Sequence, residues 1–125
     1  MRRDGEETER WNRLHPMAAP RRSHLEHCLS DARGPVIAAT DYLKEVANQV
    51  RPFVEGRCYV ALGTDGFGLS DTREALRRHF EVDRHHIVLA ALTALARDGA
   101  IGVEKAAEAI VRYGIDPEAV SPARP

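Results

Sequence analysis

Two short apolar runs, with an amphipathic segment between them, organise the middle of the chain. Residues 36–40 and 58–62 are continuous apolar stretches bounded by turn residues, which is typical of strands buried on both faces. Between them, four apolar side chains recur at the spacing of one helical stripe: Leu43, Val46, Ala47 and Val50. Asp41 stands at the expected N-cap of this helix, and Pro52 ends the pattern. The order strand, helix, strand predicts a βαβ unit with two parallel strands.

The pattern after residue 70 predicts three helices in succession. Asp71 and Glu74 have the spacing of a capping box at the start of the first helix, and its buried side consists of three residues: Ala75, Leu76 and Phe80. Asp83 can cap the second helix, which Asp98-Gly99 ends. Its apolar stripe is Ile87, Val88, Ala91, Leu92 and Leu95. The third helix ends near Gly114, and its stripe is Val103, Ala106, Ala107, Ile110 and Val111.

The N-terminal third has a weaker pattern. Residues 6–14 predict a short helix with Trp11 and Leu14 on one face, which His15-Pro16 ends because a residue before proline disfavours the α region. A connector, residues 16–20, precedes a second short helix at residues 23–29. Two strands alone make a poor parallel sheet. We therefore expect a further strand. Either residues 23–29 form it in place of a helix, or a partner chain supplies it.

The composition indicates one small domain with an ordinary hydrated surface. The 125 residues are 43% hydrophobic and 30% charged, with a formal net charge of -1, so strong non-specific binding to nucleic acid has no electrostatic basis. The chain has no apolar run long enough to cross a membrane and no signal peptide, which favours the cytoplasm. There Cys28 and Cys58 are expected to be reduced, and we interpret both as buried thiols rather than a redox pair or nucleophile.

A glycine-containing loop, residues 63–68, follows the second strand, where phosphate-binding loops occur. The spacing matches no phosphate-binding motif, no lysine is near, and Asp65 and Asp71 would repel a phosphate. We therefore favour a tight structural turn, in which Asp65 and Arg73 make structural hydrogen bonds or an ion pair.

The histidines and carboxylates predict no active site. His24 and His27, with Cys28 beside them, could face one way on a helix as a metal pair would, but further ligands at regular spacing are missing. We favour surface or locally hydrogen-bonded imidazoles, and we expect His85-His86 to be exposed in a first helical turn. No histidine lies in a hydrolase motif, and the carboxylate pairs lie on charged helix faces. From these residues alone we predict no catalytic, cofactor-binding or metal-binding residue.

Five ordered blocks nevertheless carry a family resemblance. They are ERWNRLHP at 9–16, GPVIAATDY at 34–42, LGTDGFG with SDTREALR at 62–77, FEVD at 80–83 and YGIDP at 113–117. They resemble the C-terminal, transketolase-like third domain of the homodimeric bacterial decarboxylating component of pyruvate dehydrogenase, over residues 3–121. The LGTDGFG–SDTRE part of the block at 62–77 is specific.

The resemblance implies a small, mostly parallel α/β sheet with flanking helices, without the strand that opens this domain in the family. It also implies three parts of the chain: an N-terminal helix and connector of the same domain at 1–33, the transketolase-like α/β domain at 34–121, and a tail at 122–125. Leu69 stands where the family commonly has arginine, which weakens any electrostatic role for that position.

In such enzymes thiamine diphosphate and magnesium lie between the first two domains, so this chain is expected to bind neither. The third domain contributes to packing and dimerisation. The residues expected to have structural or interface roles are therefore Gly63, Thr64, Asp65, Gly66, Phe67, Gly68, Asp71, Arg73 and Glu74.

By this resemblance the chain supports an enzyme that decarboxylates pyruvate and acetylates a lipoyl group, and is inactive alone. Its expected partners are the missing thiamine-binding domains, a homodimer partner and the dihydrolipoyl acetyltransferase component. The alternative is a stand-alone interaction module that docks on the intact enzyme or on itself through an exposed sheet edge. A third hypothesis, a small nucleotide-binding domain using the glycine loop, requires saturable binding.

Overall fold

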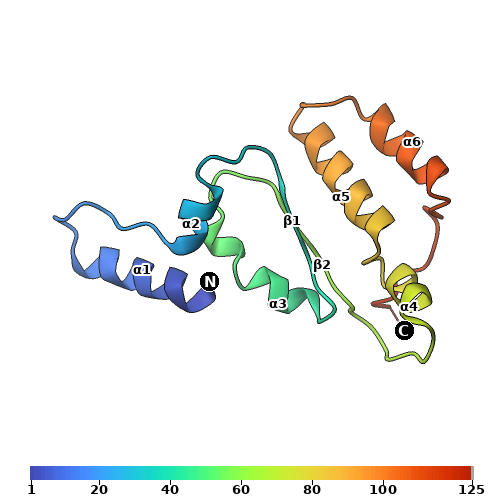
Figure 1. Ribbon diagram of the computed structural model, residues 1–125, viewed down its shortest axis with the longest axis horizontal. Helices are drawn as coiled ribbons and strands as arrows, with labels where there is room; N and C mark the ends of the chain where they lie inside the picture. The colour runs from blue at the N-terminus through green and yellow to red at the C-terminus, as the bar shows by residue number, and fades with distance from the viewer. Residues whose placement is uncertain (125) are drawn as a thin grey trace.

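A small parallel sheet joins two groups of helices (Figure 1). The computed structural model describes residues 1–124. In chain order the elements are α1 (Arg2–Leu14), α2 (His24–Leu29), β1 (Val36–Ala39), α3 (Lys44–Asn48), the 3-10 helix η1 (Arg51–Phe53), β2 (Tyr59–Leu62), α4 (Arg73–His79), α5 (Arg84–Arg97) and α6 (Glu104–Arg112). Figure 1 shows α1 and α2 at one end of an elongated molecule and α4, α5 and α6 at the other. Residue 125, the last of the predicted tail, lies outside the described residues.

The strands confirm the predicted βαβ unit. β1 and β2 are parallel, with Val36 opposite Tyr59 and Ala39 opposite Leu62. Backbone bonds from Val36 N to the Cys58 carbonyl (2.8 Å) and from Thr40 N to the Leu62 carbonyl (3.0 Å) extend the pairing. Helices α3 and α5 each pack on both strands, from opposite sides in Figure 1. The chain is thus a small α/β fold.

The expectation that both strands are buried on both faces is wrong. Of the strand residues only Tyr59 is buried. Ala39 is exposed, and the remaining strand residues are partly exposed. With only two strands in residues 1–124, each strand has an open edge that a single helix per face cannot cover. Residues 24–29 form a helix, as first predicted, so they do not provide a third strand.

The best-buried cluster lies between the N-terminal helices and the sheet. It consists of Leu25, Phe53, Val54 and Tyr59. The Tyr59 hydroxyl donates to the carbonyl of Ala47 at 2.5 Å, which satisfies its polar end and ties β2 to α3. Helix α1 joins the cluster through Gly5, where an added Cβ would lie 2.6 Å from the Phe53 ring. The N-terminal helices therefore pack into the same core as the strands.

A buried capping box starts α2. The Ser23 hydroxyl accepts from the Glu26 amide at 3.3 Å, the Glu26 carboxylate accepts from the Ser23 amide at 2.5 Å, and Ser23 is 1% exposed. We expect Ser23→Ala to lower the free energy of unfolding by about 1 to 2 kcal/mol, because it removes the cap and leaves a buried amide without an acceptor. Urea unfolding measures this loss. Ser30→Ala, at the exposed end of α2, should change stability by less than about 0.5 kcal/mol, and equal losses would contradict the prediction.

Two of the three predicted side-chain caps differ from expectation. Helix α3 begins at Lys44 with Leu43 at the N-cap and no side-chain cap, while the carboxylate of Asp41 pairs with Arg77 instead. Helix α4 is capped by Thr72, whose hydroxyl accepts from the Ala75 amide at 3.2 Å, one residue later than predicted. The cap at Asp83 is confirmed. Capping residues adjacent in sequence compete, and the tertiary partner of each side chain decides between them.

Much apolar surface is exposed. A compact monomer of this mass exposes about 6,700 Å², whereas this chain of 13.9 kDa exposes 9048 Å². Exposed apolar side chains occur at the start of α3 and within it, in the loop after β2, and at the two ends of α6. They are Leu43, Val46, Phe67, Leu69, Val103 and Val111. The predicted stripes of α3 and α6 are therefore only partly buried. None of the helices in residues 1–124 has the length and apolar character needed to span a bilayer.

Candidate functional site

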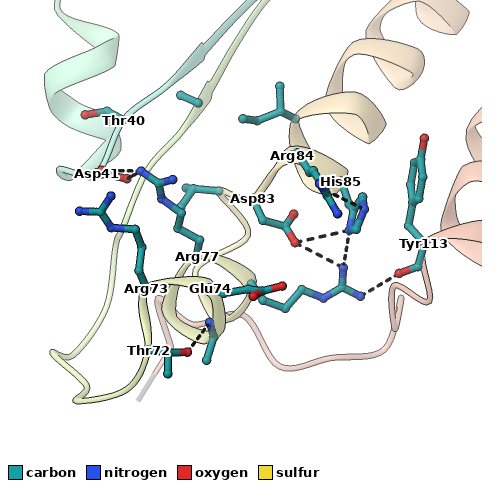
Figure 2. Close-up of a pocket in the computed structure, with 15 residues that line it drawn as sticks. Thr40, Asp41, Thr72, Arg73, Glu74, Arg77, Asp83, Arg84, His85 and Tyr113 are labelled. Atoms are coloured by element: carbon teal, nitrogen blue, oxygen red, sulfur yellow. Dashed lines mark hydrogen bonds and ion pairs between the residues drawn. The ribbon is translucent and has the colours of Figure 1, made fainter.

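An open groove of about 1260 Å³ lies at the carboxyl end of β1, between α4, the start of α5 and the end of α6 (Figure 2). Its first wall comes from Thr40 and Asp41, directly after β1, and from the first turns of α4. Its second wall comes from Arg84, His85 and Tyr113. In α/β folds the carboxyl ends of parallel strands are where ligands bind, so this groove is the candidate site.

Asp83 joins the two walls. One carboxylate oxygen accepts from the His86 amide at 2.9 Å and lies 2.7 Å from the His86 ring nitrogen Nδ1. The other oxygen accepts from Arg78 Nη1 at 3.4 Å, and the ring of His85 lies 3.7 Å from it. The predicted exposure of His85 and His86 is wrong: both are partly buried, because Asp83 holds them at the corner between α4 and α5.

Arg78 continues this network to the end of α6. Its Nη2 donates to the carbonyls of Tyr113 at 3.1 Å and Gly114 at 2.6 Å. These carbonyls follow the last helical turn, where no intrahelical donor remains. The His85 ring stacks on Tyr113 at 4.6 Å, so the same corner also contains an aromatic contact. The sequence assigned no role to Arg78, which lies in no motif, or to Tyr113, which opens the block at 113–117, because their contact spans 35 residues.

The surroundings of Asp83 indicate that the stability of the fold depends on pH. Burial alone would raise the pKa of Asp83, but hydrogen bonds from His86 and Arg78 hold the pKa below its usual value near 3.8. The charged carboxylate therefore stabilises the fold above the unfolded-state pKa, and this contribution is lost as the pH falls through the lower folded-state pKa. We expect the free energy of unfolding to fall below about pH 4 more steeply in the natural chain than in Asp83→Asn. Urea unfolding at a series of pH values measures this, and parallel curves would contradict it.

The opposite wall contains a second ion pair. Arg77 Nη2 lies 3.0 and 3.3 Å from the two carboxylate oxygens of Asp41, which fixes α4 against the end of β1. Arg73, one turn earlier on α4, and Glu74 also line the groove, and neither forms an ion pair with another described residue. The expected structural bond of Arg73 is therefore not seen within residues 1–124.

The first half of the glycine loop is fixed to the turn before α3. The Thr64 amide and hydroxyl donate to the carbonyls of Tyr42 and Asp41, both at 2.9 Å. Asp65 accepts from the Lys44 amide at 3.2 Å, as expected for a structural side chain. Gly66 has a φ of +133°, and an added Cβ would collide with the carbonyl of Pro122 in the C-terminal tail. These contacts connect the first half of the loop to the turn before α3 and to the C-terminal tail.

The second half of the loop projects from the molecule. Phe67 is 72% exposed, and a Cβ added at Gly68 would have no neighbour within 4 Å. Among residues 1–124 the carboxylate of Asp71 accepts only from the Thr72 amide, at 2.6 Å. Of the nine residues with expected structural or interface roles, only Arg73 and Glu74 reach the groove. The structure thus separates a fixed turn, an exposed apolar tip and a charged wall.

The N-terminal histidines His24 and His27 are not among the residues that line the groove, and the His24 ring makes a local contact. The His24 ring nitrogen Nε2 lies 3.4 Å from the Cys28 sulfur, one turn apart on α2. Cys28 is exposed and Cys58 partly so, which corrects the interpretation of both as buried thiols. Within residues 1–124, no three His, Cys, Asp or Glu side chains come together as a metal site would require.

The fold and the comparisons agree on the class of protein. A family model described as "Transketolase-like TK C-terminal domain" matches residues 9–83. The chain belongs to this transketolase C-terminal-like family, as its parallel βαβ unit with flanking helices indicated.

Among proteins of known name, the chain is similar to the "Pyruvate dehydrogenase E1 component" of several bacteria. It is 58% identical to the one from Pseudomonas aeruginosa over 122 residues, which are 98% of this chain and 14% of that protein. The identity is 59% to the Cupriavidus necator protein and 49% to the Escherichia coli protein, in each case over 96% of this chain and 13% of the relative. The chain therefore spans about one seventh of the length of these curated relatives, and it matches their C-terminal region.

Proposed function

We propose that the chain is the C-terminal domain or fragment of a pyruvate dehydrogenase E1 component, and that it contributes assembly and dimer contacts to the enzyme. The observation that carries this proposal is the excess of exposed surface, 9048 Å² on a chain of 13.9 kDa, together with open edges on both strands. A chain with this much exposed surface, including large apolar side chains such as Phe67, is stabilised by packing against further protein. By resemblance, that protein is the remainder of a cytoplasmic enzyme that decarboxylates pyruvate.

Catalytic groups are proposed to come from elsewhere in the enzyme. The resemblance implies thiamine diphosphate and magnesium, and Mg²⁺ binds through open carboxylate oxygens and phosphates. In the groove, Asp41 and Asp83 already accept from arginine and histidine, while in the loop Asp65 and Asp71 accept from backbone amides. These four carboxylates are already hydrogen-bonded, so we assign none of them to this cofactor and derive no catalytic step through it.

The exposed loop tip is the proposed contact. Phe67 and Leu69 project beyond a turn whose base Thr64 and Asp65 fix in place. Burying these exposed apolar side chains against a partner favours association. The rest of the same polypeptide, its homodimer partner and the dihydrolipoyl acetyltransferase component are the proposed partners.

Complementation in trans tests the proposal. The Pseudomonas aeruginosa relative would be truncated before the region that this chain matches, and then mixed or co-expressed with this chain. We expect pyruvate decarboxylation, with thiamine diphosphate and Mg²⁺, from the pair and none from this chain alone. Phe67→Ser should reduce recovery, whereas Met17→Ser, exposed on the connector, should not. Turnover by the isolated chain, or no association with the truncated enzyme, would contradict the proposal.

The alternative function is a stand-alone interaction module, favoured by the same open strand edges. Such a module would bind the full-length enzyme without restoring a truncated one, or would self-associate. Co-purification with intact enzyme and light scattering of the chain alone separate these two outcomes.

A further inference from the structure

We propose that the groove between α4 and α5 binds the phosphate group of a small organic molecule without a metal ion. The inference goes beyond the proposed assembly function and does not depend on it. It rests on three observations about the groove: an excess of cationic donors, a histidine between two guanidinium groups, and an apolar wall beside them.

The cationic donors outnumber the carboxylates available to them. Four arginines line the groove, namely Arg73, Arg77, Arg78 and Arg84, against three acids, Asp41, Glu74 and Asp83. Two of those acids are already used, because Arg77 is paired with Asp41 and Arg78 with Asp83. Among the described residues this leaves two guanidinium groups, on Arg73 and Arg84, against the single carboxylate of Glu74. Figure 2 shows Arg73 and Arg84 on opposite sides of the groove.

His85 lies between two of these guanidinium groups. Arg78 Nη1 lies 3.4 Å from its Nδ1, and Arg84 Nε lies 3.4 Å from its Nε2. A neutral imidazole has one acceptor nitrogen, and an imidazolium has none. Only one of these contacts can therefore be a hydrogen bond, so N–H donors at this wall outnumber the acceptors. An oxyanion is the ligand that supplies the missing acceptors.

The size and lining of the groove favour an organic phosphate over a free inorganic ion. Its volume of about 1260 Å³ is far larger than one phosphate needs. Apolar side chains line it beside the arginines: Ala39, Ala75, Val82 and Ile87. Tyr113, stacked on His85, adds an aromatic edge. A phosphate can accept from the arginines while an attached organic group packs on this apolar wall.

Titration of the whole chain with inorganic pyrophosphate at low ionic strength tests the site, with isothermal calorimetry and amide NMR shifts as readouts. We expect saturable binding that shifts the amides of His85 and Tyr113, and no such shifts with chloride at the same ionic strength. Arg73→Gln and Arg84→Gln should each weaken binding about tenfold. Glu74→Gln should tighten it, because it removes the unpaired carboxylate from the groove.

Arg3→Gln is the matched control, because it makes the same charge change on α1 at the other end of the molecule, and it should alter the affinity less than about twofold. Arg73 has no ion pair with a described residue, so its replacement should leave the far-UV circular dichroism unchanged even if Arg84→Gln disturbs α5. Equal weakening by Arg3→Gln, or no pyrophosphate-dependent shift at His85 and Tyr113, would overturn the proposal. Failure of phosphate binding would leave the proposed assembly function untouched, because complementation of the truncated enzyme tests that function separately.

Discussion

Replacing Gly63 by alanine should destabilise the chain by about 3 kcal/mol, because the added methyl group has no space. An added Cβ would lie 2.5 Å from the Lys44 amide nitrogen and 2.7 Å from the Tyr42 carbonyl oxygen. Both are backbone atoms, so the strain can be relieved only by moving the end of β2 away from the start of α3. That movement would also break the bond from the Thr64 amide to the Tyr42 carbonyl. Urea unfolding followed by circular dichroism measures the loss.

Gly68→Ala is the matched control in the same loop. Gly68 is exposed, its φ is not in the left-handed region, and nothing lies within 4 Å of an added Cβ. Its replacement should be neutral or stabilise by up to about 1 kcal/mol, since alanine restricts the unfolded chain. Similar losses in the two variants would mean that the close approach at Gly63 does not govern stability.

Replacing Asp83 by alanine should cost about 2 to 4 kcal/mol of stability at neutral pH, because one change removes a helix cap and a charge partner. Without Asp83, the His86 amide loses its acceptor and Arg78 loses the carboxylate that positions it against Tyr113 and Gly114. The corner where α4, α5 and α6 meet should loosen. Hydrogen exchange at the end of α6 should therefore accelerate together with the fall in unfolding free energy.

Asp83→Asn separates the two roles of this residue. Asparagine is a good N-cap, so this variant should keep the bond from the His86 amide and lose the carboxylate charge that faces Arg78 and the His86 ring, with about half the effect of alanine. Asp98→Ala, at the exposed C-cap of the same helix, should be neutral, because a carboxylate there opposes the helix dipole. If Asp98→Ala cost as much as Asp83→Ala, the proposed corner network would be wrong.

The local sequence pattern predicted the positions of helices and strands more reliably than it predicted which residues are buried. The two strands, the capped start of α5 and the ends at Asp98 and Gly114 lie where the sequence indicated. The failures concern neighbours: Asp41 pairs with Arg77 instead of capping α3, and the apolar side chain of Val111 is 83% exposed instead of buried. A helical stripe shows which face is apolar, but whether that face is covered depends on which elements pack against it.

The groove itself was not predicted from the sequence. Arg73 and Glu74, expected from a family block to have structural or interface roles, line the groove, whereas Arg78 and Arg84 lie outside the family blocks and Tyr113 lies in a block that indicated no site. Arg78 contacts Tyr113 across 35 residues of sequence, and no spacing rule relates two residues that far apart.

The sequence by itself determined the βαβ order, the parallel strands, the helices that follow and the family of the chain. These properties depend on hydrophobic period, on turn and capping residues and on ordered blocks, all of which are local in sequence. Only the tertiary structure decided that Asp83 and Arg78 together join α4, α5 and the end of α6, that Gly63 meets the backbone before α3, and that four arginines face one groove. These arrangements depend on how distant segments pack, and packing is a property of the whole chain.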